Sequence, residues 1–380
     1  MALGELRLVA WEITRRCNLA CPHCRASAID EPYEGELSTS ECFSVIDDIA
    51  EVGRPTIIFT GGEPLLREDF FDIAAYARAQ GLGVAIGSNG TLLDERIATK
   101  MKNIPISRLG VSLDFPEARD QDQFRGMPGA FEATLRGMEV CRRHGIEVQI
   151  NSTITKLNVH HLDQLLTLAL KCGVVAFHPF FLVPTGRGKN MKAWELSPQE
   201  YEHTLRWIYH RQVELGEQIF LKPTDAPHYV RVMLEVGQEG VLRGRGIPEK
   251  SSIFLGFPRR VPSRIEDSAG CKMNSITRGC LAGIGFCFIS HVGRVQGCGY
   301  LDVEAGNLRE QKFGDIWQNS PLFGELRDYS KIKGKCGLCE YKTVCGGCRA
   351  RAYEATGDYL EAEPCCIYQP RAARSLNAVD

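Results

Sequence analysis

The 380-residue chain lacks a long hydrophobic run, an excess of charge of either sign, an internal repeat and a low-complexity tract. Its longest apolar stretch, Val174 to Val183, is interrupted by His178 and Pro179 and is too short to span a bilayer. Forty-five basic residues against 47 acidic ones give a formal net charge of −2, without the positive field that nucleic-acid binding requires. We therefore expect neither a membrane span nor a nucleic-acid partner.

The N-terminus also lacks a basic region followed by an apolar stretch, which is the pattern of a secretory signal peptide. Cysteine, in contrast, is abundant, at 16 residues. Without a secretion signal, thiolates committed to metal in a reducing cytoplasm explain this number better than disulfide bonds do. We therefore expect a cytoplasmic, metal-binding protein.

Three cysteines lie close together near the N-terminus, where Cys17, Cys21 and Cys24 form the pattern Cys-x3-Cys-x2-Cys. An iron–sulfur cube usually takes four thiolates, so a cube held by these three would keep one iron free for another ligand. A zinc site or a redox-active pair is the alternative that these residues alone leave open.

Residues 7–183 alternate short β-branched runs with helical patterns, which is typical of a parallel α/β fold. The expected strands are Leu8–Ile13, Thr56–Thr60, Gly83–Gly87, Ser107–Leu113, Glu147–Thr153 and Val174–Phe181. The expected helices are Ser38–Val52, Asp69–Gln80, Asp94–Lys102, Ala130–His144 and Val159–Cys172. Six such units make a partial (β/α)6 barrel of the TIM type, in which chemistry belongs at the carboxyl ends of the strands.

Composition divides the chain into three expected parts. Residues 1–215 form the partial barrel, and residues 216–278 form a bridging segment that could face a substrate, rich in Gly, Pro and Arg toward its end. Residues 279–380 hold nine of the 16 cysteines, which predicts a small cysteine-rich iron–sulfur domain.

Polar groups and glycines follow the expected strands, one strand end after another. They are Gly61, Gly62, Glu63 and Pro64, then Ser88 and Asn89, then Ser112 and Asp114, then Arg125 and finally Asn151. Two adjacent glycines let the backbone approach a ligand closely, and the small polar side chains offer it hydrogen bonds. Taken singly, each residue is equally explained as a turn residue, a helix cap or, for Arg125, a surface arginine.

The C-terminal cysteines form a second framework: Cys280, Cys287 and Cys298, then Cys336, Cys339, Cys345 and Cys348, then Cys365 and Cys366. The block from Cys336 to Cys348 would, in isolation, also fit a zinc ribbon. Three further cysteines, Cys42, Cys141 and Cys172, lie on expected helices and are interpreted as buried apolar fillers, and Cys271 is not assigned.

The N-terminal cysteine pattern together with the strand-end motifs resembles the radical S-adenosylmethionine (radical SAM) enzymes. The resemblance implies that Cys17, Cys21 and Cys24 hold a [4Fe-4S] cluster whose open iron binds S-adenosylmethionine and cleaves it to a 5′-deoxyadenosyl radical. It also implies the residues that contact this cofactor: Gly61 to Pro64 at its amino group, Arg125 near its carboxylate, and Ser88, Asn89, Ser112, Asp114 and Asn151 at its ribose or carboxylate.

The C-terminal framework resembles the SPASM extension of these enzymes, which binds up to two auxiliary [4Fe-4S] clusters. The resemblance implies interleaved ligands: Cys280, Cys287, Cys298 and Cys348 for one cluster, and Cys336, Cys339, Cys345 and Cys366 for the other. The family usually has three residues, not two, before the cysteine that corresponds to Cys348. The doublet Cys365-Cys366 leaves the final ligand open.

Longer stretches resemble one branch of the superfamily: Trp11–Arg15, Phe124–Phe131, Leu182–Gly188, Ala226–Tyr229, Gly285–His291 and Cys345–Tyr353. This branch comprises the heme synthases of the siroheme-dependent heme pathway and sister enzymes that act on other siroheme-derived tetrapyrroles. The resemblance implies oxidative decarboxylation of iron-coproporphyrin III propionates to vinyl groups, which gives heme b, with an electron donor such as flavodoxin or ferredoxin. Asp225 stands where members of the branch carry a cysteine.

Residues for the substrate are harder to assign. Asp225 and His228 are the catalytic candidates, since His228 could ligate the porphyrin iron or act as an acid, although a capped loop histidine explains it equally well. Propionates need cations, and the candidates are Arg187, Arg231, Arg243, Arg245, Arg259, Arg260 and Arg264.

Two other functions remain open. A radical SAM maturase of ribosomal peptides would use the same clusters, but many maturases carry an extra N-terminal domain, and the first expected strand begins too soon after Met1 to leave room for one. A non-catalytic iron–sulfur or zinc protein would not need the strand-end motifs for S-adenosylmethionine.

Overall fold

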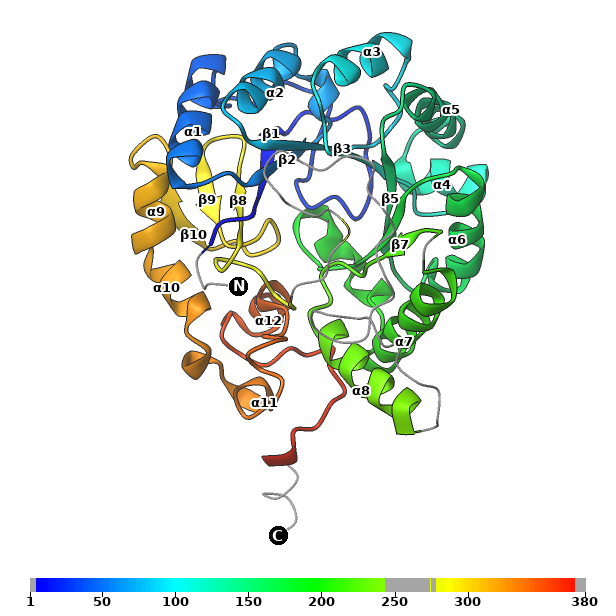
Figure 1. Cartoon of the computed structure of the whole chain (residues 1–380), viewed down its shortest axis with the longest axis vertical. Coiled ribbons are helices and arrows are strands. Elements are labelled where there is room, and N and C mark those ends of the chain that lie inside the picture. Colours follow the sequence, from blue (N-terminus) through cyan, green and yellow to red (C-terminus); the bar gives the residue numbers. More distant parts are fainter. Residues whose placement is uncertain (1–4, 217, 243–273, 275–277, 373–380) are drawn as a thin grey trace.

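The computed structural model describes residues 5–216, 218–242, 274 and 278–372. Within them, ten strands form one sheet in the order β10-β9-β8-β1-β2-β3-β4-β5-β6-β7. Neighbouring strands from β8 through β1 to β7 are parallel, whereas β9 and β10 are antiparallel at one edge. Figure 1 shows the sheet curving around the centre of the molecule with helices on its outside.

The strands are β1 Leu8–Thr14, β2 Thr56–Gly61, β3 Gly83–Ser88, β4 Arg108–Ser112, β5 Val148–Ile154, β6 Ala176–Phe181, β7 Phe220–Leu221, β8 Phe286–Ile289, β9 Arg294–Gln296 and β10 Glu304–Asn307. The helices of the first part are α1 Thr39–Val52, α2 Phe70–Ala79, α3 Glu95–Asn103, α4 Ala118–Arg125, α5 Ala130–Arg143, α6 Leu162–Lys171, α7 Pro198–Leu215 and α8 Tyr229–Leu242. Later helices are α9 Phe313–Asn319, α10 Pro321–Arg327, α11 Gly334–Gly337 and α12 Arg349–Thr356. The expected partial barrel is confirmed, while α4 was not expected.

Local sequence signals explain where several helices begin. Ser38 and Glu41 form a reciprocal capping box at the start of α1, and Ser197 and Glu200 do the same for α7. Asp94 caps α3 by accepting a hydrogen bond from the backbone N–H of Ile97.

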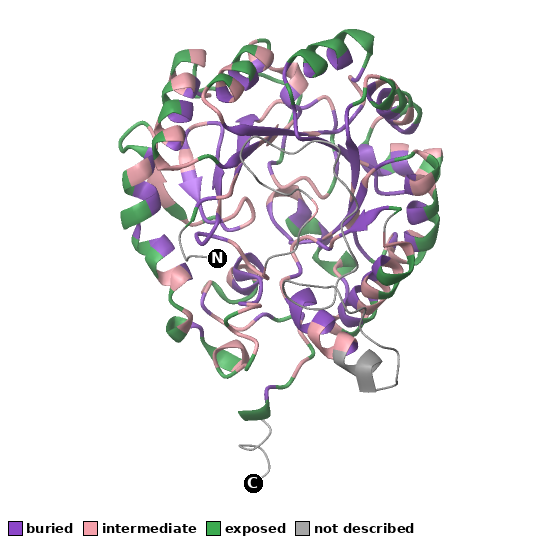
Figure 2. Cartoon of the chain, in the orientation of Figure 1, coloured by how far each residue is buried: buried purple, intermediate pink, exposed green. Residues whose placement is uncertain are grey.

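The two faces of the sheet differ in side-chain size. Val9, Trp11 and Ile13 of β1 are buried in the core between sheet and helices, and Figure 2 shows the strands buried and the outer helix faces exposed. The opposite, inner face carries small residues. They include Ala10 on β1 and, farther along the sheet, Gly87 on β3 and Gly110 on β4, which lie side by side in the β3–β4 register. Neighbouring side chains cover these two glycines: a Cβ on Gly110 would lie 2.8 Å from the Asn151 side-chain nitrogen, and one on Gly87 would lie 3.3 Å from the Thr60 hydroxyl oxygen.

The C-terminal part does not stand apart from the barrel. Residues Phe286–Ile289 of β8 pair in parallel with Leu8–Trp11 of β1, and β9 and β10 continue the same sheet. The cysteine-rich part is therefore built onto the first strand of the barrel, which a boundary drawn at residue 279 from composition does not convey.

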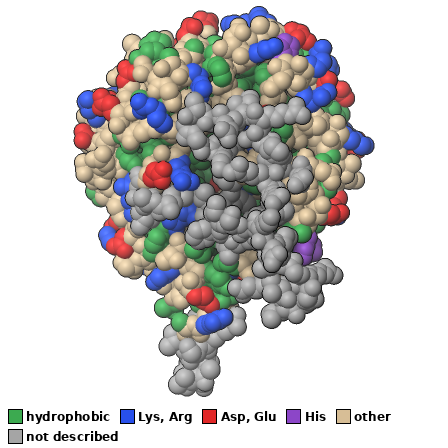
Figure 3. Space-filling model, viewed as in Figure 1, with side chains coloured by type: hydrophobic (Ala, Val, Ile, Leu, Met, Phe, Trp, Pro, Cys, Tyr) green, Lys and Arg blue, Asp and Glu red, His purple; other side chains and the backbone are tan. Residues whose placement is uncertain are grey.

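The described residues include no helix that is both long and apolar enough to cross a lipid bilayer. Figure 3 shows acidic and basic side chains interspersed around the face that it displays.

Candidate metal and cofactor site

The loop that follows β1 brings Cys17, Cys21 and Cys24 together, and Figure 1 shows this loop inside the curve of the sheet. The three thiols lie close together, so that negative charge on Cys21 or Cys24 would raise the pKa of Cys17. The backbone N–H groups of Leu19 and Ala28 donate to the sulfur atoms of Cys17 and Cys24, each at 3.4 Å. These three thiols are called the loop thiols below.

Burial raises the pKa of Cys17 to about 12 and also raises that of Cys21. Without metal, both thiols therefore hold their protons at neutral pH. Binding of iron requires thiolates, so loading this site releases protons.

Gly61 and Gly62 pack directly against the start of the cysteine loop. A Cβ on Gly62 would lie 2.2 Å from the carbonyl oxygen of Arg16, and one on Gly61 would lie 2.1 Å from that of Thr14. The N–H of Gly62 donates to the Thr14 oxygen and the N–H of Glu63 donates to the Arg16 oxygen, each at 2.8 Å. The sequence suggested close approach to a ligand; the structure shows close approach to the loop that carries Cys17.

Glu63 joins the next two strand ends. Its carboxylate accepts hydrogen bonds from the Ser88 hydroxyl at 2.9 Å and from the Asn89 backbone N–H at 2.7 Å. Burial raises the pKa of Glu63 to about 7, because its hydrogen-bond partners offset only part of the desolvation. The Asn89 amide in turn donates to Asn18 of the loop at 2.9 Å and lies 3.8 Å from the sulfur of Cys17.

Arg125 at the end of α4 also reaches the loop thiols. Its guanidinium pairs with the buried carboxylate of Asp114 and lies 3.7 Å from the sulfur of Cys21. Asp114 accepts a further hydrogen bond from the Thr153 N–H at 2.6 Å, which fixes it between β4 and β5. Arg125 is therefore not a surface arginine.

Ser112 and Asn151 lie beside each other in the β4–β5 register, on the inner face of the sheet. Gln149 donates to the side-chain oxygen of Asn151 at 2.7 Å. Pro64 begins the short helix that follows Glu63 and is buried. Nine of the ten residues expected around the cofactor thus lie at the carboxyl ends of β2, β3 and β4 or on α4, and Asn151 lies in the middle of β5, opposite the last residue of β4.

Three C-terminal thiols form a first group, Cys280, Cys298 and Cys348. These thiols lie close together: negative charge on Cys280 or Cys348 would raise the pKa of Cys298, and negative charge on Cys280 would raise that of Cys348. Cys348 joins this group even though only two residues separate it from Cys345.

The structure does not bring Cys287 into the first C-terminal group. Cys287 lies on β8 opposite Val9, in the core between sheet and helices, and Arg327 is the side chain whose charge acts on it. The next residue, Phe288, faces the other way and packs under Arg25 of the cysteine loop, 4.4 Å from its guanidinium carbon. Strand alternation therefore separates Cys287 from the other three thiols.

Four thiols form a second C-terminal group, Cys336, Cys339, Cys345 and Cys366. The charges of the other three act on Cys345, and that of Cys336 acts on Cys366.

The neighbouring Cys365 instead lies against Glu195, with its sulfur 3.7 Å from a carboxylate oxygen. Of the doublet, Cys366 is thus the residue that the structure places with the second group.

The three cysteines interpreted as fillers lie away from these groups. Cys42 and Cys141 are fully buried in the core, and Cys172 is partly buried against it. Cys271 falls outside the described residues.

No set of three or more His, Cys, Asp or Glu side chains among the described residues is arranged to hold a single metal ion.

A bridge that the sequence did not reveal links the loop thiols to the first C-terminal group. Arg25, next to Cys24, donates to the Gly299 carbonyl oxygen at 3.4 Å and pairs with Glu12 at 2.5 Å. Burial alone would raise the pKa of Glu12, but Arg25 and a hydrogen bond with His291 lower it to about 2.

Tyr300 completes this bridge. The charges of Cys24 and Cys298 both act on its hydroxyl, so the phenol lies near the loop thiols and near the first C-terminal group. The only signal in the sequence was its place two residues after Cys298.

Two arginines proposed for substrate propionates are engaged within the protein. Arg187 donates to the carbonyl oxygens of Cys21 and Ala28, at 2.9 and 2.5 Å, and so holds the cysteine loop. Arg231 pairs with Glu202 and with Glu235. Arg187 keeps one buried nitrogen, Nη2, without a hydrogen-bond partner among the described residues. The other arginine candidates, Arg243, Arg245, Arg259, Arg260 and Arg264, lie outside the described residues.

The two catalytic candidates lie beside the C-terminal part. Both ring nitrogens of His228 are buried and have no hydrogen-bond partner among the residues that the structure describes, and burial lowers the pKa of this histidine to about 4. Its ring packs against that of Tyr201, with the centroids 5.7 Å apart. Asp225 follows β6 and β7, and its charge acts on Cys298 and Cys348.

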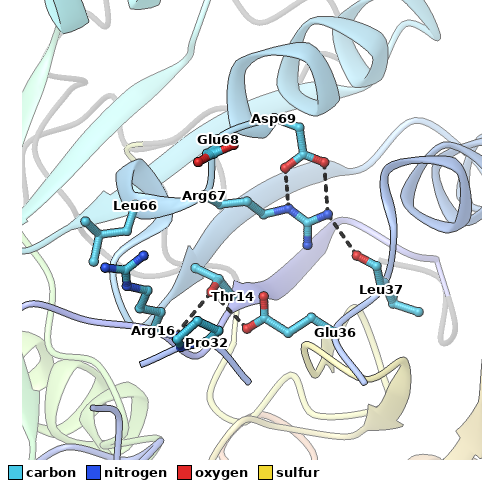
Figure 4. A pocket seen from close by; sticks show the side chains of 9 residues that line it. All are labelled: Thr14, Arg16, Pro32, Glu36, Leu37, Leu66, Arg67, Glu68 and Asp69. Atoms are coloured by element: carbon cyan, nitrogen blue, oxygen red, sulfur yellow. Dashed lines mark hydrogen bonds and ion pairs between the residues drawn. The ribbon is translucent and has the colours of Figure 1, made fainter. Parts of the chain in front are cut away.

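A pocket between the end of β1 and the start of α2 is a separate feature (Figure 4). It is lined by Thr14, Arg16, Pro32, Glu36, Leu37, Leu66, Arg67, Glu68 and Asp69. Arg67 donates to Asp69 at 2.7 Å and to the Leu37 carbonyl oxygen at 2.8 Å, and Thr14 donates to Glu36 at 2.9 Å. Its polar groups serve one another, and we assign it no ligand.

Known proteins place this geometry in a family. Residues 11–169 match the Radical SAM superfamily, and residues 280–349 match SPASM, an iron–sulfur cluster-binding domain. An AdoMet-dependent heme synthase of Methanosarcina barkeri is 48% identical over 365 residues, which cover 96% of this chain and 97% of that protein. One from Oleidesulfovibrio alaskensis is 44% identical over 96% of this chain and 88% of that protein.

The chain belongs to the AdoMet-dependent heme synthase family of radical SAM enzymes. It is therefore an enzyme that uses S-adenosylmethionine and a [4Fe-4S] cluster, and its SPASM domain implies auxiliary iron–sulfur clusters. The crystal structure of Streptococcus suis SuiB bound to S-adenosylmethionine shares the fold, with a TM-score of 0.70 at 12% identity, over 96% of this chain and 78% of that one.

The residues of this heme synthase family member fit the iron–sulfur clusters that the family implies. The loop thiols supply three soft donors with N–H groups directed at two of the sulfurs, and the C-terminal groups supply seven more. The matches to the Radical SAM superfamily and to the SPASM iron–sulfur domain favour iron–sulfur clusters over zinc at both places.

Proposed function

We propose that this enzyme is a heme synthase that converts two propionate groups of iron-coproporphyrin III to vinyl groups and so forms heme b. The observation that carries the proposal is the 48% identity to the Methanosarcina barkeri heme synthase along nearly the whole of both chains. The placement of a C-terminal thiol group beside the loop thiols supports it, because the reaction needs both a radical and an electron acceptor.

The chemistry balances as follows. Each propionate loses one hydrogen atom from its β-carbon, then carbon dioxide and one electron, and the two carbons that remain form the vinyl group. When bound, the cluster at the loop thiols and S-adenosylmethionine supply the 5′-deoxyadenosyl radical that takes the hydrogen atom, and an auxiliary cluster supplies the acceptor for the electron.

The loop thiols are the proposed ligands of the first cluster. Around S-adenosylmethionine we assign Gly61, Gly62, Glu63, Pro64, Ser88, Asn89, Ser112, Asp114, Arg125 and Asn151. Arg125 is suited to a carboxylate because its charge is already directed at the loop thiols by Asp114. Glu63 is suited to an ammonium group because its partners are neutral donors and leave its charge uncompensated.

The second C-terminal group, Cys336, Cys339, Cys345 and Cys366, supplies four thiolates for one auxiliary cluster. Cys280, Cys298 and Cys348 supply three for the other. The Arg25–Gly299 contact joins the segment that carries Cys298 to the loop that carries Cys24.

The substrate is a small-molecule tetrapyrrole in this proposal, and flavodoxin or ferredoxin is the class of protein that we propose as electron donor. His228 is suited to a role near the porphyrin, because two unpaired, buried ring nitrogens are available to a metal or a proton.

The test is an anaerobic incubation of the reconstituted enzyme with S-adenosylmethionine, a reductant and iron-coproporphyrin III, followed by mass spectrometry. We expect the neutral porphyrin to lose two carbon dioxide units and four hydrogens in all, through a monovinyl intermediate. For each propionic acid group these hydrogens are the abstracted hydrogen atom and the acid proton. Robust cleavage of S-adenosylmethionine with an unchanged porphyrin would contradict the substrate and favour a sister tetrapyrrole or a peptide.

A further inference from the structure

We infer that the carboxylate of Asp225 is the fourth ligand of the auxiliary cluster held by Cys280, Cys298 and Cys348. The inference concerns the SPASM cluster and is independent of which substrate the enzyme decarboxylates. The first C-terminal group holds three thiols, whereas a closed cube takes four protein ligands, so one ligand is missing.

Within the described part of the chain, the remaining C-terminal cysteines are not placed to supply the fourth ligand. Cys287 lies on the opposite face of β8, in the core beside Arg327. The four thiols of the second group act on one another, and Cys365 lies against Glu195. Among the residues that the structure describes, the donor therefore has to be a residue other than cysteine.

Asp225 is the carboxylate placed to fill this position. Its charge acts on Cys298 and on Cys348, which are two of the three thiols. Its Oδ2 atom is buried and makes no hydrogen bond among the described residues. A buried carboxylate oxygen without a donor is costly, and an iron ligand role would remove that cost.

The backbone presents Asp225 to the thiols. Thr224 is held by a parallel bridge to Phe180 at the end of β6, and Asp225 then adopts a left-handed conformation with φ 61°. A non-glycine residue in this region marks a position that the surroundings enforce.

Arg351 fixes Asp225 and Cys348 relative to each other. Its guanidinium donates to the Asp225 carbonyl oxygen at 3.1 Å, and its backbone N–H donates to the sulfur of Cys348 at 3.4 Å. One residue of α12 thus connects the turn that carries Asp225 to one of the thiols.

Two other oxygen groups near these thiols are less suitable. Glu363 accepts the N–H of Cys348 at 2.8 Å and pairs with Arg351 at 3.4 Å, so its charge is already engaged. Tyr300 is a phenol with an ordinary pKa of about 10, so it is protonated at neutral pH and a poor ligand. Asp225 alone of the three combines proximity with an unpaired oxygen.

A carboxylate ligand changes the properties of the cluster. Oxygen is a harder donor than sulfur and binds cluster iron less tightly. The cluster should therefore lose one iron more readily and have a higher reduction potential than an all-thiolate cube, because a thiolate donates more charge to the iron. A higher potential suits a site that receives an electron.

The experiment uses full-length protein in which Cys17, Cys21 and Cys24 are replaced by Ala, so that the loop cluster contributes no signal. The protein is grown with ¹³C-carboxylate-labelled aspartate and its auxiliary clusters are reduced. Pulsed electron–nuclear double resonance then detects ¹³C bound through oxygen to the cluster. We expect a ¹³C coupling that is absent from unlabelled protein.

Asp225→Cys supplies a fourth thiolate and should abolish the ¹³C coupling, lower the reduction potential of one auxiliary cluster and slow its loss of iron to a chelator. Asp302→Asn, at an exposed position four residues after Cys298, is the control and should change none of these. No ¹³C coupling in the parent protein, or a coupling that survives in Asp225→Cys, would overturn the inference. If Asp225→Cys fails to fold, the labelled parent still decides. No porphyrin is present, so the outcome is separate from that of the proposed function.

Discussion

The two cysteine-rich regions of this enzyme are built in contrasting ways. The loop thiols come from one short segment after β1, and the barrel holds that segment through backbone contacts with Gly61, Gly62 and Arg187. The C-terminal groups are assembled from segments far apart in sequence, with Cys348 leaving the block around Cys345 to join Cys280 and Cys298.

The difference matches the two roles. In the proposed function, the short loop with three thiols leaves an iron open to S-adenosylmethionine, whereas the ligands of the auxiliary clusters come from several segments and tie these parts of the chain together. The contact between Arg25 and Gly299 joins the two regions.

The largest expected effect comes from removing the loop thiols. Replacing Cys17, Cys21 and Cys24 together by Ala should abolish reductive cleavage of S-adenosylmethionine, because these thiols are the proposed ligands of the cluster that binds it. The C-terminal domain should keep its iron and its thiolate-to-iron absorption, with more than about four irons per chain if both auxiliary sites fill. Continued formation of 5′-deoxyadenosine by this variant would show that the two regions are not specialised in this way.

Removing two thiols of the first C-terminal group should separate radical formation from product formation. Cys280→Ala combined with Cys298→Ala should stop vinyl formation but leave uncoupled cleavage of S-adenosylmethionine, since hydrogen abstraction does not need the auxiliary cluster. Both products are quantified by chromatography and mass spectrometry.

Cys287→Ala is the matched control, because Cys287 lies in the core and away from the other three thiols. It should retain vinyl formation at some cost in stability. Full vinyl formation by the double variant would eliminate the electron-acceptor role of this group.

A smaller effect is expected where the barrel supports the cysteine loop. Gly62→Ala would place a Cβ 2.2 Å from the Arg16 carbonyl oxygen, so the backbone must shift, at roughly 1–3 kcal/mol. We expect lower iron occupancy of the loop site and a lower Tm. Gly324→Ala on α10 meets no atom within 4 Å and should be neutral or stabilising. Equal iron occupancy in both variants would refute the supporting role of Gly62.

The sequence predicted the barrel and the loop thiols because their signals are local. Strand-forming runs, the capping box at Ser38 and the tight spacing from Cys17 to Cys24 are all set within short segments. The pairing of β8 with β1 could not be predicted in the same way, since it joins opposite ends of the chain.

Side-chain direction was the second limit. Cys287 belongs to the cysteine framework by spacing, but strand alternation turns it toward the core. Arg187 has the charge expected for a propionate, yet it holds the cysteine loop. Both outcomes depend on which neighbours the folded chain provides, and spacing alone carries no such information.

The smallest effect is expected at an exposed ion pair between α1 and the segment that follows β10. Arg309 donates to Glu41 at 2.8 Å and lowers the pKa of this carboxyl to about 2, so Glu41→Gln should cost no more than about 1 kcal/mol at neutral pH. Because the folded pKa lies below the ordinary 4.5, the advantage of Glu41 is present above pH 4.5 and is lost as the pH falls toward 2.

Thermal unfolding at several pH values checks this prediction. Glu51→Gln removes a more distant and more exposed pair with Lys312, 3.8 Å apart, and should leave Tm unchanged. A Tm difference between wild type and Glu41→Gln that grew as the pH fell below 4.5 would contradict the sign.

The most direct test of the division between radical formation and electron acceptance is the ratio of 5′-deoxyadenosine to vinyl groups formed by the wild-type enzyme from iron-coproporphyrin III under anaerobic conditions. The account predicts that one S-adenosylmethionine is consumed for each vinyl group, because each decarboxylation begins with one hydrogen abstraction. Vinyl formation without matching 5′-deoxyadenosine, or 5′-deoxyadenosine without any vinyl product, would contradict it.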